Sequence, residues 1–190
     1  MLAGVLLALP VRADVLPLLA RVADLSGDVL NVRDGAGAGF DDIGDLRRGT
    51  RVEVVGYNAD RSWAQIIWQD GNGWVAARFL TPFDPPQLAS GLPVGLSCTG
   101  AEPFWSLTLS DTGRLRFASP AMTADTDIVW SAPSRNEGNL RYGLTSAGIS
   151  GVLARNQCIA AGTGQIRGWT LDLIVPGQTP TLLSGCCMAN

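Results

Sequence analysis

The chain has 190 residues and a formal net charge of −3, with 46% hydrophobic residues, 16% charged residues and no histidine. This composition is typical of one medium or two small globular domains and excludes an intrinsically disordered chain. An acidic chain without a basic stripe is not expected to bind nucleic acid. The absence of histidine removes the Ser–His–Asp and Cys–His systems and most zinc sites, so we expect no metal, no cofactor and no enzymatic activity.

Residues 1–13 have the pattern of a signal peptide. An apolar run from Leu2 to Leu9 ends at Pro10, and Val11 and Ala13 occupy the −3 and −1 positions of a cleavage site. The run is too short for a transmembrane helix, because Pro10 and Arg12 interrupt it. We therefore expect a periplasmic or secreted protein without a membrane span. The alternative is a buried N-terminal strand or helix.

Residues 18–83 have the pattern of a small all-β module. Short runs with strand propensity alternate with turn signals such as "NADRS" and "QDGNG". The glycine-rich stretch Asp34–Asp42 is expected to be a solvated loop, because its acids lack the spacing of an EF-hand. About five short strands are enough for a closed barrel. The clearest of these are Leu30–Arg33, Arg51–Tyr57, Trp63–Trp68 and Gly73–Ala76.

The order of the motifs in this module resembles that of a bacterial SH3 (SH3b) domain. The matching elements are "LNVR" (Leu30–Arg33), "IGDLRRG" (Ile43–Gly49), "GNGWV" (Gly71–Val75) and "FL" (Phe79–Leu80). The resemblance covers Leu30–Leu80 and implies a small barrel that binds a peptide or glycan of the cell wall, or an envelope protein. Peptidoglycan is therefore an expected partner.

Five residues of this module are candidates for ligand binding. Asn31 and Arg33 alternate with apolar residues and are expected to face away from the core, where Arg33 would pair with a carboxylate of a wall peptide or with a neighbouring aspartate. Trp63 and Trp74 would form an aromatic wall, unless both belong to the barrel core. Tyr57 is a further candidate for the groove.

Residues 84–95, which include "DPPQLASGLP", are expected to be a linker, and residues 96–190 a second module. About seven short strands predict a small antiparallel barrel or sandwich, so the whole chain is assigned to the all-β class. The expected strands are Phe104–Leu109, Arg114–Ala118, Asp127–Ala132, Leu140–Leu144, Gly151–Arg155, Trp169–Val175 and Thr181–Cys187.

The four cysteines, Cys98, Cys158, Cys186 and Cys187, are an even number, which in an exported chain indicates disulfides. Neighbouring residues of a strand point to opposite faces. We therefore expect Cys186 and Cys187 to reach different partners, one taking Cys98 and the other Cys158. A tetrathiolate zinc site and a dithiol redox site are the alternatives, but both usually draw on CxxC pairs.

The stretch "CTGAEPFWSLTL", together with the terminal "GCC", resembles an uncharacterised family of exported envelope proteins, which implies no particular activity. Glu102 and Trp105 are candidate binding residues, although the favoured explanation is structural, with Glu102 in a turn and Phe104 and Trp105 alternating in and out of the core. Two further hypotheses concern this module. One is a hydrolase that uses Glu102 with Asp125 and Asp127. The other is a carrier of a small ligand, lined by Trp105 or Trp130.

Overall fold

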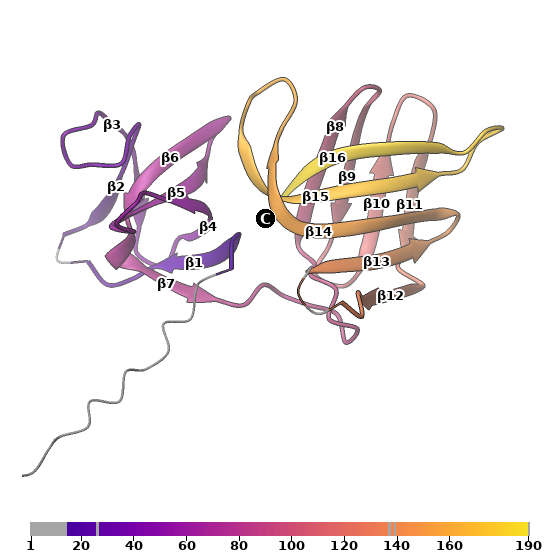
Figure 1. The fold of residues 1–190 in the computed structure, drawn as a ribbon, viewed down its shortest axis with the longest axis horizontal. Helices are drawn as coiled ribbons and strands as arrows, with labels where there is room; N and C mark the ends of the chain where they lie inside the picture. The colour runs from indigo at the N-terminus through magenta and orange to yellow at the C-terminus, as the bar shows by residue number, and fades with distance from the viewer. Residues whose placement is uncertain (1–14, 26, 137, 139, 190) are drawn as a thin grey trace, which may run out of the picture.

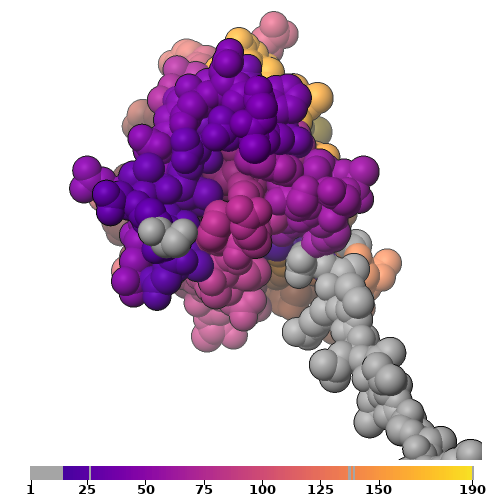
Figure 2. Space-filling view, turned by 90° about the vertical axis from the view of Figure 1, so that its left-hand side faces the viewer, coloured from indigo at the N-terminus to yellow at the C-terminus, as the bar shows by residue number. Residues whose placement is uncertain are grey.

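The computed structural model describes residues 15–25, 27–136, 138 and 140–189, and almost all of its regular structure is β-strand. The predicted signal peptide lies outside these residues. The strands form two modules that lie side by side, as Figure 1 shows in indigo to magenta for the first and magenta to yellow for the second. Figure 2 views the end of the first module that faces away from the second. The predicted all-β class is confirmed.

The N-terminal barrel is a seven-stranded sheet with the strand order β3-β2-β6-β5-β4-β1-β7. Its strands alternate apolar and polar residues. In β2, for example, Leu30 and Val32 point into the core, and Asn31 and Arg33 point outward. A short 3₁₀ turn, η1, precedes the last strand. The elements are β1 (Leu18–Val22), β2 (Val29–Arg33), β3 (Asp42–Arg47), β4 (Arg51–Tyr57), β5 (Trp63–Trp68), β6 (Gly71–Ala76), η1 (Ala77–Phe79) and β7 (Leu80–Phe83).

The C-terminal module is a nine-stranded antiparallel sheet with the order β11-β10-β9-β8-β16-β15-β14-β13-β12. Most buried apolar side chains of the sheet belong to one core cluster, with Trp105, Phe117 and Trp169 among them. The strands are β8 (Leu96–Ala101), β9 (Phe104–Leu109), β10 (Arg114–Ala118), β11 (Thr123–Asp127), β12 (Trp130–Pro133), β13 (Arg141–Ser146), β14 (Ile149–Ile159), β15 (Ile166–Val175) and β16 (Thr181–Ala189).

The two edge strands of this sheet, β11 and β12, follow one another in the sequence. The predicted strand Asp127–Ala132 is therefore wrong: β11 ends at Asp127, the chain crosses to the opposite edge, and β12 begins at Trp130. The Val129 N–H donates to the carbonyl oxygen of Thr145 at 2.9 Å, and the Ser146 hydroxyl donates to that of Asp127 at 2.7 Å. These bonds hold the edges together, so the sheet bends around its core.

The segment 84–95 packs against the C-terminal module instead of spanning open space. Leu92 and Val94 are at most 1% exposed and belong to the core of that module. The Val94 N–H donates to the carbonyl oxygen of Pro86 at 2.9 Å, and the Leu88 N–H donates to that of Leu92 at 3.0 Å. The segment expected to be a linker is thus fixed by apolar burial and by its own backbone hydrogen bonds.

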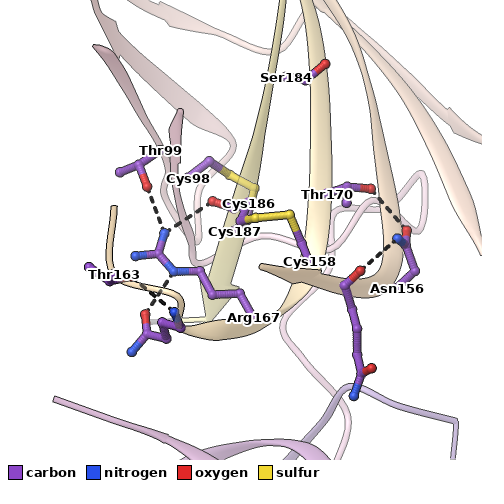
Figure 3. Close-up of a disulfide and its surroundings, with 12 residues drawn as sticks. Cys98, Thr99, Asn156, Cys158, Thr163, Arg167, Thr170, Ser184, Cys186 and Cys187 are labelled. Atoms are coloured by element: carbon purple, nitrogen blue, oxygen red, sulfur yellow. Dashed lines mark hydrogen bonds between the residues drawn. A yellow bond between two sulfur atoms is a disulfide. The ribbon is translucent and has the colours of Figure 1, made fainter. Parts of the chain in front are cut away.

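The two disulfides lie on opposite faces of the C-terminal sheet (Figure 3). Cys187 pairs directly with Cys98 across β16 and β8, on the core side. Cys186 points to the outer face and bonds to Cys158 at the end of β14, where a register shift follows Arg155. The prediction that the two adjacent cysteines reach different partners is confirmed.

The hairpin of β14 and β15 reaches toward the N-terminal barrel (Figure 1), and amide side chains of both modules bind backbone groups across the interface. Gln157 donates to the carbonyl oxygen of Val55 at 2.5 Å. Asn72 exchanges two hydrogen bonds with the backbone of Ile166, at 2.8 and 2.9 Å. Gln165 donates to two carbonyl oxygens in the turn between β5 and β6. Because these bonds satisfy backbone groups of both modules, they fix one relative orientation.

Glu53 lies at the centre of this interface and is only 5% exposed. Its Oε2 accepts from the N–H of Ala189 at 2.5 Å, while Oε1 has no hydrogen-bond partner among the described residues. Burial raises the pKa of Glu53 from 4.5 to about 7, and the nearby N–H groups of Ala189 and Gly168 and the charges of Arg167 and Arg155 offset this only in part. The interface therefore holds a carboxyl group that stays neutral up to about pH 7, where an exposed glutamate would be ionised.

Candidate binding groove on the N-terminal barrel

Three of the predicted binding residues, Asn31, Arg33 and Trp63, line one surface pocket of about 220 Å³. Asn31 and Arg33 are on the outward side of β2, and Trp63 begins β5. Trp63 is half-buried, because its ring also packs against the barrel core. The pocket is completed by Leu30, Ala38, Ala76, Arg78 and Phe79.

The loop after β2 is held beside this pocket by the predicted residues themselves. Arg33 donates from Nη1 to the carbonyl oxygen of Phe40 at 2.7 Å, and Asn31 donates to the carboxylate of Asp42. The ring of Phe40 lies against Gly35, where a Cβ atom would collide with it. The loop therefore has a defined shape, and a glycine is required where the ring meets the backbone. Arg33 retains further N–H groups for a ligand.

A second pocket, of about 400 Å³, adjoins the first, since Arg78 lines both. The Arg61 guanidinium lies 4.3 Å from the centre of the Tyr57 ring, and that of Arg78 lies 4.5 Å from the centre of the Phe79 ring. We call the two pockets together the groove. The second is lined by Leu18, Tyr57, Arg61, Ser62, Ala77, Arg78, Leu80 and Pro82.

The groove is positively charged on a chain whose net charge is negative. Its lining includes Arg33, Arg61 and Arg78, and none of the described residues that line it is acidic. Guanidinium groups bind carboxylates through paired hydrogen bonds, and the aromatic rings of Trp63 and Tyr57 offer apolar contact beside them. The groove is thus suited to an anionic ligand with an apolar part.

The other predicted binding residues lie elsewhere. Trp74 is half-buried in β6, opposite Gln65 and Arg33, and lines neither pocket. Glu102 is exposed in the turn between β8 and β9. Trp105 is 1% exposed and packs in the core of the C-terminal module, with its ring centre 6.1 Å from that of Phe117. Its ring therefore offers no surface to a ligand in solution.

The structure does not bring together the three carboxylates of the hydrolase hypothesis. Glu102 precedes Phe104, the first residue of β9. The register of β9, β10 and β11 places Asp125 level with Thr108, four residues farther along β9, which is about 13 Å. Asp127 pairs still farther along. Carboxylate pairs of glycosidases are about 5 to 9.5 Å apart.

Sequence reasoning did not select Arg61 or Arg78. Arg61 lies in the turn after Tyr57 and Arg78 in η1, so no strand periodicity indicates where their side chains point. Arg78 could have been selected because it directly precedes "FL" (Phe79–Leu80), the last element of the family resemblance. The turn between Tyr57 and Trp63 also fixes the groove, since the Asn58 side chain accepts from the Trp63 N–H at 2.9 Å.

Residues 28–81 match the family model of the bacterial SH3 domain. The family model thus finds a bacterial SH3 domain at these residues, within the N-terminal barrel. All residues that line the groove fall within this match except Leu18 and Pro82. Neither the search of curated proteins nor the search of solved structures gave a match, and the comparisons give no support to the expected resemblance of the C-terminal module to an envelope family. Among the residues described, no helix is both long enough and apolar enough to span a membrane, and no cluster of metal-ligating side chains was found.

Proposed function

We propose that this is an exported, non-enzymatic protein of the cell envelope, whose SH3 groove binds a carboxylate-bearing peptide of the cell wall. The observation that carries the proposal is the convergence of Arg33, Arg61 and Arg78 on a groove with Trp63 and Tyr57 in its walls. SH3 domains are binding modules, which agrees with this use of the groove. A wall glycan or an envelope protein with an acidic segment is the alternative ligand.

Two observations support export. All four cysteines are in disulfides, which persist in oxidising compartments such as the periplasm and are rare in the cytosol. The first thirteen residues have the apolar run and small-residue cleavage site of a signal peptide. Together they favour a periplasmic or secreted location, where a wall peptide is within reach.

Retention on purified peptidoglycan tests the proposal. The unmodified protein should be retained, and R78Q should weaken retention about tenfold or more, because it removes a charge-assisted contact shared by both pockets. The matched control is R47Q, which removes an exposed arginine of β3 outside the groove and should bind as the unmodified protein does. Equal retention of R78Q and R47Q would exclude the groove, and no retention of the unmodified protein would exclude wall binding.

A further inference from the structure

The C-terminal module has a recess on the outer face of its sheet, about 250 Å³ in volume, which the proposed function does not use. It forms where the Cys158–Cys186 disulfide ties the end of β14 against β16, so that Ile159 and Ala161 project beside the sheet. We call it the outer recess. It is lined by Thr99, Gly100, Ala101, Cys158, Ile159, Ala161, Thr170, Asp172, Ser184, Gly185 and Cys186.

The polar groups of the recess come from adjacent strands that present them on one face. Thr170 and Asp172 are two residues apart on β15, and Ser184 of β16 lies directly opposite Asp172. Figure 3 shows Thr170 and Ser184 with the Cys158–Cys186 disulfide. Because the sheet fixes these positions, the three side chains project from the same face at neighbouring positions of the two strands.

The hydrogen bonds that these groups already make determine what they still offer to a ligand. The Ser184 hydroxyl donates to Oδ1 of Asp172 at 2.6 Å, and the Thr170 hydroxyl donates to the side chain of Asn156 at 3.0 Å. Both hydroxyls have therefore used their hydrogen atoms and present only lone pairs, as does Oδ2 of Asp172. The hydroxyl of Thr99 keeps its hydrogen, since it accepts from Arg167 at 2.8 Å.

The recess therefore offers an acidic group and two hydroxyl acceptors. None of the described residues that line it carries a positive charge, although Arg167 beside it donates to Thr99 and to the carbonyl oxygen of Cys186. An ammonium group has three donors, no acceptor and a positive charge, which match these three acceptors. Ile159, which is 73% exposed, Ala161 and the disulfide form an apolar side along which methylene groups can lie. The volume suits a short chain and not a large ligand.

We propose that the outer recess binds an aliphatic primary ammonium group, such as the end of a lysine side chain. Asp172 supplies the charge, Ser184 and Thr170 accept the remaining N–H groups, and the apolar side contacts the alkyl chain. The site is in a different module from the SH3 groove, so this inference stands independently of the proposed function. An exposed pair of charges with a short alkyl chain gives binding in the millimolar range.

Nuclear magnetic resonance titration of the full chain with intact disulfides tests the proposal. The probes are 1,5-diaminopentane, an end-blocked peptide with one lysine, and the same peptide with that lysine acetylated. The first two should shift the amide signals of Thr170, Asp172 and Ser184, and the acetylated peptide should not. Tighter binding of the peptide would assign the site to lysine side chains of a polymer, whereas equal binding of the two would assign it to free amines.

Two variants test whether the ammonium group binds at Asp172. D172N keeps the shape and removes the charge, and it should weaken amine binding about tenfold or more. D127N removes an exposed acid of β11 outside the recess and should leave binding unchanged. Because both side chains are exposed, neither change is expected to unfold the sheet. Shifts that persist in D172N, or equal shifts with the acetylated peptide, would overturn the proposal.

Discussion

Raising the pH from about 5 to about 9 is expected to destabilise the protein by about 3 kcal/mol, because the buried Glu53 must ionise. Below pH 4.5 the carboxyl group is protonated in both states, and folding releases no proton. Between 4.5 and about 7 the unfolded chain loses the proton while the folded protein keeps it, so stability falls. Above about 7 both states are ionised and the loss is complete. The two pKa values differ by about 2.5, at about 1.36 kcal/mol per pH unit.

The substitution E53Q isolates this effect. A glutamine has the size of the glutamic acid, cannot ionise, and keeps a carbonyl oxygen that accepts from the Ala189 N–H. The variant should lose most of the pH dependence between 5 and 9 and should be more stable than the unmodified protein at the alkaline end. The matched control is E102Q, which changes an exposed glutamate and should retain the full pH dependence.

Urea denaturation followed by tryptophan fluorescence measures both proteins over this pH range. The effect of Glu53 can be separated from other titrations, because the chain has no histidine and all four cysteines are in disulfides. Few other side chains then titrate between pH 5 and 9. The reasoning is refuted if E53Q shows the same pH dependence as the unmodified protein, or if stability of the unmodified protein rises toward pH 9.

Three further changes probe how the modules are held. Replacing Cys158 and Cys186 by serine opens a loop of 28 residues and should cost about 4 kcal/mol in urea denaturation, with no effect expected if the bond is absent in solution. G168A places a methyl group against Pro17 at the interface and should cost about 1 to 3 kcal/mol, whereas an unchanged midpoint would mean that the modules are not docked. L92A should cost about 2 to 5 kcal/mol, and a cost near zero would show that segment 84–95 is a free linker.

The elements that local pattern determines were predictable from the sequence. Leu30 and Val32 alternate with Asn31 and Arg33, and this alternation predicted both the strand and the outward side that became part of the groove. The adjacency of Cys186 and Cys187 predicted two disulfides on opposite faces. In both cases the prediction needs only the residue and its neighbour along the same strand, because neighbouring side chains point to opposite faces.

The interface between the modules depends on contacts that no local pattern contains. Glu53 occupies the polar position of an alternating strand and would be exposed if the barrel were alone. It is buried because the end of β16 packs against it. Gln157 and Gln165 have no periodic signal, since they act through single amides on backbone groups about a hundred residues away. Leu92 and Val94 lie among glycines and prolines, which predicted a linker.

The position of the interface on the barrel determines how the proposed binding groove is oriented relative to the C-terminal module. The contacts use the outward side of β4 and the start of β6, through Glu53, Val55 and Asn72. The groove uses η1, the outward side of β2 and the start of β5, through Arg78, Arg33 and Trp63. The interface thus leaves the groove uncovered while it fixes the barrel in one orientation. A ligand held in the groove is therefore held at a constant orientation to the C-terminal module and its outer recess.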